Sequence, residues 1–250
     1  MPDILEVKGL SVSFYRPEGE QQALKNVSFS LHKGEILAVM GKTGCGKSVL
    51  CKSILKLLPD VARIRTGRIL FHGREITGYS EKQMQKLRGN AFSMVFQNPM
   101  TALNPCMTVG DQIAEAVRLR QPALSRGKRQ EKAEELMELV GFPHPKERKK
   151  QYPGQLSGGM AQRCAIAIAL AADPEILFAD EPTTALDVTV QAQILELFLE
   201  LRKKTGMTIV FVTHNPGVAA KVADRVALMR DGELCGIAGV EEFFEESIFD

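Results

Sequence analysis

The chain has 250 residues, a length that suits one large domain or two small ones. Its 44% hydrophobic content supports a sizeable core, and its 25% charged residues are ordinary for a soluble protein. The net charge of +2, from 32 basic and 30 acidic residues, gives no electrostatic footprint for nucleic acid, so we expect no nucleic-acid partner.

The cysteines and the apolar runs indicate a cellular compartment. Five scattered cysteines without a Cys-x-x-Cys pair fit a reducing cytosol, not a disulfide framework or a zinc site. The N-terminus shows neither a basic region nor a long apolar region, so no secretory signal is visible. The longest apolar run, Cys164–Ala172, is far too short to cross a bilayer. If the protein works on a membrane, we therefore expect a peripheral partner.

The N-terminal part of the chain is predicted to begin with a pair of strands, Ile4–Phe14 and Asn26–Leu31, joined across a turn. The apolar run Ile36–Met40 predicts a buried strand. A glycine-rich stretch then leads into the predicted helix Val49–Leu58, and a short strand is expected at Thr66–Gly73.

The middle of the chain changes character. We interpret Pro99–Gln155 as a helical insertion into an α/β core, because the apolar spacing from Val109 to Val140 is helical and no linker separates the segment. The remaining predictions are helices at 82–87, 157–172 and 188–204, and strands at 91–96, 176–179, 208–212 and 226–229. Strands that alternate with helices predict a mostly parallel sheet covered on both faces. We expect the acidic tail, Glu241–Asp250, to be poorly ordered.

The stretch Val39–Ser48, with the sequence VMGKTGCGKS, lies between a predicted strand and a predicted helix. Glycines leave the turn uncrowded, so its backbone N–H groups can point at phosphate oxygens, and a helix N-terminus favours negative charge. Lys47 would lie by the β- and γ-phosphates, and the Ser48 hydroxyl would bind Mg²⁺. The expected nucleotide contacts here are Gly41, Gly44, Cys45, Gly46, Lys47, Ser48 and Val49.

Two carboxylates, Asp180 and Glu181, end a predicted buried strand. Sites in open α/β sheets lie at the carboxyl ends of strands. Asp180 could hold Mg²⁺ directly or through water, and Glu181 could accept a proton from the attacking water or position that water. By themselves the two acids would equally suit a loop cap before Pro182. The phosphate loop in the same chain favours the catalytic interpretation.

Gln97 and His214 also follow apolar strands, which would bring both to the edge of the sheet that carries Ser48 and Asp180. Gln97 can bind the metal or the nucleophilic water through its amide, and His214 can donate to a γ-phosphate oxygen. A lone histidine is more often structural, but its place at a strand end favours function.

The segment Leu156–Arg163, LSGGMAQR, is a second polar glycine turn that opens a helix. Ser157 could simply cap that helix, and the turn could also bind an anion. One nucleotide does not need two such turns from one protomer. Two protomers packed head to tail would each lend the second turn to the other's nucleotide.

In order and spacing, six motifs resemble those of the ATP-binding cassette (ABC) transporter ATPases over nearly the whole chain. They are Gly41–Ser48, Gln97, LSGGMAQR, ILFADE, Thr184–Asp187 and His214. The resemblance implies an α/β fold with a P-loop NTPase (RecA-like) core, an N-terminal antiparallel β subdomain and the helical insertion. It also implies the cofactors ATP and Mg²⁺ and a dimer that sandwiches ATP.

The resemblance assigns roles to single residues. Glu181 would be the catalytic base, and Asp187 would bridge the protomers. An aromatic residue of the first sheet would stack on adenine; Phe14 fits best by spacing, and Tyr15 is the competitor. The second glycine turn would contact the γ-phosphate held by the other subunit through Ser157, Gly158 and Gly159.

A narrower resemblance points to the oligopeptide, dipeptide and nickel importer ATPases. It lies in Gln97–Pro105, Met107–Gln112 and Tyr152–Gln155, and in that family the region after Gln97 faces the coupling helix of the membrane subunit. Many peptide importers carry a long C-terminal extension with a cysteine cluster. No such segment follows in this sequence, so we expect it to resemble the shorter nickel or metal-chelate members. It also has Asn215 where the family usually has aspartate.

We therefore expect an ATP-hydrolysing energy-coupling subunit of a bacterial importer for peptides, nickel or a metal chelate. It would lie peripherally on the cytoplasmic face of the plasma (inner) membrane. Its partners would be two transmembrane permease subunits, a second ATPase subunit (identical or a sister paralogue) and an extracytoplasmic substrate-binding protein. The alternative is a soluble ABC-type ATPase of translation or DNA repair, although such proteins usually have two cassettes or a coiled-coil insertion. A phosphate-loop kinase would leave LSGGMAQR unexplained.

Overall fold

A computed structural model of the chain describes residues 2–245. The chain forms two compact units. The first unit comprises Met1–Gln85 and Gly206–Asp250, and the second comprises Lys86–Thr205. The boundary between them falls within helix α2 (Glu81–Arg88) and again at the end of helix α8 (Val188–Thr205).

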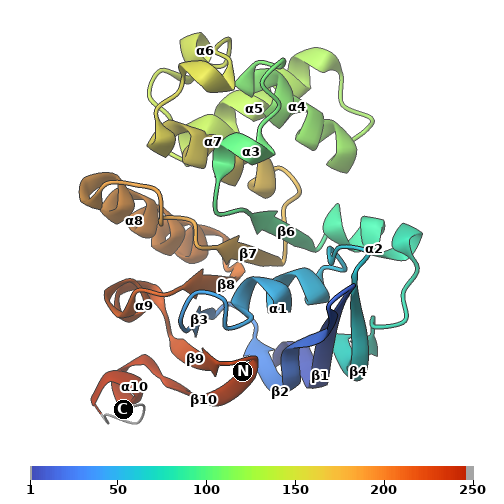
Figure 1. Ribbon diagram of the computed structural model, residues 1–250. Coiled ribbons are helices and arrows are strands. Elements are labelled where there is room, and N and C mark those ends of the chain that lie inside the picture. Colours follow the sequence, from blue (N-terminus) through green and yellow to red (C-terminus); the bar gives the residue numbers. More distant parts are fainter. Residues whose placement is uncertain (1, 246–250) are drawn as a thin grey trace. The chain divides into compact units, whose positions relative to one another are not determined.

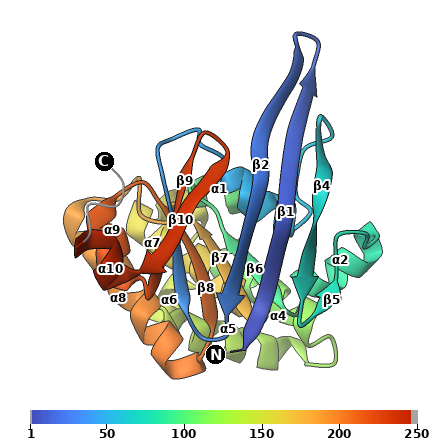
Figure 2. The same ribbon diagram turned by 90° about the horizontal axis from the view of Figure 1, so that it is seen from below.

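The first unit contains an antiparallel sheet with the strand order β2-β1-β4-β5. Its strands are β1 (Asp3–Arg16), β2 (Gly19–His32), β4 (Ala62–Phe71) and β5 (Arg74–Glu75). Figure 2 shows the long β1–β2 hairpin beside β4. The predicted strand pair is confirmed, and it extends further because the polar residues next to the turn also pair, as Tyr15 does with Glu20.

The first unit also holds four strands in the order β10-β9-β3-β8. They are β3 (Ile36–Met40), β8 (Thr208–Thr213), β9 (Arg225–Arg230) and β10 (Glu233–Gly239). Strand β3 runs parallel to both β8 and β9, whereas β10 pairs with β9 in the antiparallel direction. Every residue of β8 is buried, as a continuous apolar run predicts for a parallel strand. Helix α1 (Lys47–Ile54) follows β3, and helix α9 (Pro216–Val222) follows β8.

The second unit combines two parallel strands, β6 (Phe92–Val95) and β7 (Ile176–Asp180), with helices. Every described residue from 99 to 155 lies in a helix, a turn or a connecting segment, as expected. The limits of a helical subdomain there stay a prediction. The second unit also contains α8 and five helices that lie together in Figure 1. These five are α3 (Pro99–Ala102), α4 (Val109–Arg120), α5 (Arg126–Leu139), α6 (Pro145–Arg148) and α7 (Gly158–Leu170).

The expectation of poor order in the acidic tail is wrong for its first part. Residues Val240–Glu245 form helix α10, and Phe243 is buried in a cluster with residues such as Ala219 and Val226. The acidic residues around Phe243 obscured this apolar anchor in the sequence. The rest of the expected tail, residues 246–250, lies outside the described residues.

We expect Phe178→Ala to destabilise the protein strongly. Phe178 of β7 is 0% exposed and meets Phe92 of β6 edge to face, with ring centroids 6.0 Å apart. Removal of a buried ring leaves a cavity, so the free energy of unfolding in urea should fall by about 3–5 kcal/mol. Leu119→Ala is the control, because Leu119 is 74% exposed and should change stability by less than ~0.5 kcal/mol. Equal losses in the two variants would contradict this assignment of the core.

Candidate functional site

The loop between β3 and α1 is held between two strands of the first unit at points that only glycine fits. An ideal Cβ on Gly46 would lie 2.9 Å from the carbonyl oxygen of Ala23 in β2, and one on Gly41 would lie 2.3 Å from that of Met229 in β9. Gly46 also has a φ of 109°, which side chains rarely allow. In contrast, nothing lies within 4 Å of a Cβ built on Gly44, so the loop is open to a ligand there.

The loop places a positive charge where an anion is favoured. Lys47 begins α1, is 4% exposed, and donates through Nζ to the carbonyl oxygens of Gly41 at 2.8 Å and Lys42 at 3.0 Å. The first turn of α1 contains no acidic residue, and Ser48 follows on the same turn. A cation beside the positive end of a helix is unfavourable by itself, so this arrangement suits a bound anion such as phosphate.

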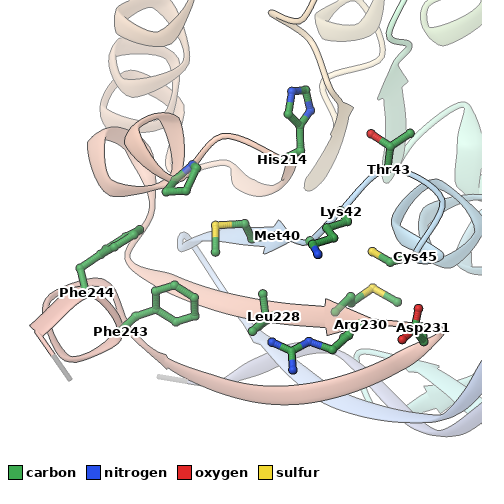
Figure 3. A pocket seen from close by; sticks show the side chains of 13 residues that line it. Met40, Lys42, Thr43, Cys45, His214, Leu228, Arg230, Asp231, Phe243 and Phe244 are labelled. Carbon is green, nitrogen blue, oxygen red and sulfur yellow. The ribbon is translucent and has the colours of Figure 1, made fainter. Parts of the chain in front are cut away.

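A cavity of about 840 Å³ lies beside this loop, within the first unit. Lys42 and Thr43 line it from the loop, and His214 lines it from the end of β8 (Figure 3). The parallel register explains this placement, because Met40 pairs with Thr213 and the two strands therefore end side by side. The structure thus brings His214 next to the phosphate loop.

Cys45 is the loop residue whose chemistry is most altered by its surroundings. Its side chain is buried, and burial raises the pKa of the Cys45 thiol, while nearby Lys47 lowers that pKa in part. The thiol therefore stays neutral in the loop, and the backbone N–H of Cys45 donates to the Lys42 carbonyl oxygen at 3.2 Å.

The second unit brings together the side chains of Gln97 and Glu181. Strands β6 and β7 pair in parallel, with Val95 opposite Ala179, so the residues after each strand meet. The Gln97 Nε2 donates to Glu181 Oε2 at 3.2 Å. Asp180 and Glu181 are only 6% and 9% exposed. A carboxylate held in this way can accept a proton from a nearby water.

The sequence analysis did not predict that Thr184 contacts the Glu181 carboxylate. Its hydroxyl donates to the same oxygen, Glu181 Oε2, at 3.0 Å. The available signal was a hydroxyl residue three positions after the carboxylate in a proline-containing turn. That signal is weak, because threonine side chains in turns commonly bond to nearby backbone groups.

The second glycine turn opens helix α7, with Ser157 as its N-cap; the Ser157 Oγ accepts from the Met160 N–H at 3.4 Å. A Cβ on Gly159 would lie 2.4 Å from Val190 Cγ1 of α8, so a larger residue there would have to displace the Val190 side chain. Ser157 and Gly158 are exposed. The capping role is thus observed, and contact with the nucleotide of a second protomer stays a prediction.

The expected roles of Asp187 and of the aromatic residue that would stack on adenine stay predictions. Asp187 is exposed, and its Oδ1 accepts from the Val190 N–H at 2.9 Å at the start of α8. Phe14 is partly buried in β1, with the Arg16 guanidinium carbon 5.9 Å from its ring centroid, whereas Tyr15 is exposed. Both aromatic candidates for adenine stacking remain open.

Asn215, the departure from the usual family pattern, has a clear structural role. It is the N-cap of α9, and its Oδ1 accepts from the Gly217 N–H at 2.9 Å. Pro216 follows at the first helical position. Asparagine and aspartate are about equally effective at an N-cap, so the exchange preserves the local structure that carries His214.

A glycine loop between a parallel strand and a helix, together with two acids that end a second buried strand, defines the class of phosphate-loop nucleotide-binding proteins. Residues 24–184 match the model of the ABC transporter family. The chain belongs to this family, as one of its ATP-binding, ATP-hydrolysing subunits.

Similar proteins include peptide transport subunits. The chain is 51% identical over 245 residues to the dipeptide transport ATP-binding protein DppD of Bacillus subtilis (strain 168), and the match covers 98% of this chain and 73% of DppD. It is also 51% identical over 242 residues to the oligopeptide transport ATP-binding protein OppD of the same strain, and this match covers 96% of this chain and 67% of OppD. These relatives support the transporter interpretation over a soluble ATPase of translation or DNA repair.

Solved structures confirm the predicted fold. The dimeric ATP-binding cassette MJ0796 in a post-hydrolysis state bound to ADP and Pi is similar, with a TM-score of 0.85, 29% identity, and coverage of 94% of this chain and 98% of that one. The cbiO1 protein of Clostridium perfringens, part of the ABC transporter complex cbiONQ, has a TM-score of 0.84 at 29% identity, covering 99% of this chain and 93% of that one. The fold is therefore a phosphate-loop NTPase fold with an antiparallel β subdomain and added helices.

We expect Asn215→Asp to leave stability nearly unchanged and Asn215→Ala to lower the free energy of unfolding by about 1 kcal/mol, because alanine cannot cap α9. Urea denaturation of the three proteins at neutral pH is the measurement. If Asn215→Ala were as stable as Asn215→Asp, the capping hydrogen bond would not contribute to stability at this position.

Proposed function

We propose that this subunit hydrolyses Mg-ATP and thereby drives the import of peptides. The observation that carries the catalytic part of the proposal is the Glu181 carboxylate, held by Gln97 and Thr184 directly after the buried strand β7. The peptide cargo is supported by the names of the similar proteins, which transport dipeptides and oligopeptides. Nickel or a metal chelate as cargo stays a prediction.

The residues present suit a bound Mg-ATP. The phosphate loop offers backbone N–H groups at an open position, Gly44, and a cation, Lys47, at the start of a helix. Hydroxyl, amide and carboxylate oxygens are the ligands that Mg²⁺ prefers, and Ser48, Gln97 and Asp180 would provide them. Bound Mg²⁺ would neutralise charge on the phosphates.

Hydrolysis then needs a group that removes a proton and groups that stabilise charge. Glu181 would accept a proton of the attacking water as the water oxygen bonds to the γ-phosphorus and the bond from the γ-phosphorus to the leaving ADP oxygen breaks, which gives ADP and inorganic phosphate. Lys47 and a ring N–H of His214 stabilise the negative charge on the γ-phosphate oxygens. Phe14 or Tyr15 would stack on adenine.

A second ATPase subunit completes the site in this proposal. Ser157 and Gly158 are exposed at the start of α7, where backbone N–H groups favour an anion. They would contact, with Gly159, the γ-phosphate bound by the other subunit, and Asp187 would bridge the two. The dimeric state of the similar cassette MJ0796 supports this arrangement, whether the second subunit is identical or a paralogue.

The membrane side of the system would consist of two permease subunits and an extracytoplasmic substrate-binding protein, with this chain bound peripherally at the cytoplasmic face. Across residues 2–245 the structure has no helix long and apolar enough to span a bilayer. In the second unit, Met100 and Tyr152 are exposed on segments that resemble peptide importers, and the exposed Phe96 directly precedes the first of these segments. A permease subunit would cover such side chains.

We expect Glu181→Gln to lower the rate of ATP hydrolysis by at least about 100-fold, because a carboxamide cannot accept the proton of water. Binding of ATP should stay within a few-fold of the original value, measured by fluorescence titration with a labelled ATP. Glu175→Gln, an exposed glutamate at the other end of β7, is the matched control and should retain hydrolysis. Full hydrolysis by Glu181→Gln would refute the proposed base.

The cargo can be tested in cells of the native host that lack this chain. We expect these cells to lose uptake of radiolabelled di- or oligopeptides and to retain nickel uptake, because the peptide system would have no source of energy. The wild-type gene should restore peptide uptake, whereas Glu181→Gln should not. Loss of nickel uptake with normal peptide uptake would refute peptides as the cargo.

A further inference from the structure

Thr184 contacts both the side chain and the backbone of Glu181. Its hydroxyl donates to Glu181 Oε2 at 3.0 Å, and its N–H donates to the Glu181 carbonyl oxygen at 3.3 Å. These two hydrogen bonds close a turn that begins directly after strand β7 and leads toward helix α8. The residue is exposed, so its hydroxyl is not needed to satisfy a buried core.

Glu181 is a residue that needs such support. It has a φ of 46°, in the left-handed region that residues other than glycine seldom adopt, and Pro182 restricts it further. Strained backbone of this kind persists only where surrounding contacts hold it, and it is concentrated at functional sites. A glutamate side chain also has several rotamers, most of which would turn the carboxylate away from a fixed position.

Two donors share one oxygen of this carboxylate. Gln97 Nε2 and Thr184 Oγ both donate to Oε2, so together they fix the carboxylate against rotation. Gln97 also has a proposed role toward the metal or water. The Thr184 hydroxyl, in contrast, contacts only the Glu181 carboxylate among the proposed site residues. Hydrogen bonds to an ionised acceptor are about twice as strong as neutral ones, which makes this contact an effective restraint.

We propose that Thr184 is a positioning residue for ATP hydrolysis. Its hydroxyl holds the Glu181 carboxylate in the orientation that accepts the proton of the attacking water. This inference rests on the proposed role of Glu181 as the base. It assigns the function of Thr184 to the hydroxyl. Serine should therefore replace threonine, whereas valine, which has the same shape without the hydroxyl, should not.

The test compares Thr184→Val and Thr184→Ser in steady-state ATP hydrolysis by the full chain with Mg²⁺. We expect valine to lower kcat about tenfold, which corresponds to ~1.4 kcal/mol in the barrier, and to leave KM for ATP within about twofold. Serine should restore kcat to within about twofold. Thr66→Val is the matched control, because Thr66 lies on strand β4 and its hydroxyl contacts the Gly9 carbonyl at 3.3 Å.

The urea midpoint of each variant shows whether folding is preserved, and Thr184→Ala replaces the valine variant if valine unfolds the protein. A wild-type kcat, a change confined to KM, or a failure of serine to restore kcat would overturn the inference. In a Glu181→Gln background, Thr184→Val should cause no further loss of kcat, and an additional tenfold loss would also overturn it.

The two proposals fail in different ways. A normal kcat for Thr184→Val together with the loss in Glu181→Gln refutes the role of Thr184 and retains the proposed base. Normal hydrolysis by Glu181→Gln refutes the base itself.

Discussion

Parallel strand pairing is the constraint on which both groups of predicted site residues depend, one group in each unit. Hydrogen bonds between β3 and β8 make Met40 and Thr213 neighbours, so the residues that follow, the phosphate loop and His214, border one cavity. The pairing of β6 with β7 likewise puts Gln97 within hydrogen-bonding distance of Glu181. In each unit, buried apolar strands bring polar residues together that are far apart in the sequence.

The polar turns at the helix starts have a structural role that is compatible with the proposed chemistry. Ser157 and Asn215 each cap a helix with a side-chain oxygen, and Gly46 starts α1 in a conformation that suits glycine. A well-formed helix N-terminus presents N–H groups in a fixed direction, which is also what an anion requires. The capping interpretation and the binding interpretation of such a turn are therefore compatible.

The similar proteins and the geometry support different parts of the proposed function. Relatives such as DppD and the cassette MJ0796 show the family, the fold and the class of reaction. The geometry adds what their names do not contain, a glutamate in a left-handed conformation whose carboxylate oxygen accepts two side-chain hydrogen bonds. Local hydrogen bonds hold the strained backbone at this position, so the surrounding turn supports the orientation of the acid.

The sequence by itself determined most of the order of strands and helices, the phosphate loop and the family, because apolar periodicity and a glycine pattern are local properties of the chain. It also placed Gln97 and Glu181 at strand ends. It did not reveal β10, whose pattern is weakly apolar, or α10, whose anchor Phe243 stands among acids. Only the tertiary structure decided that Oε2 of Glu181 is shared by Gln97 and Thr184, since that contact depends on strand register, a left-handed backbone and one turn, none of which leaves a periodic trace in the sequence.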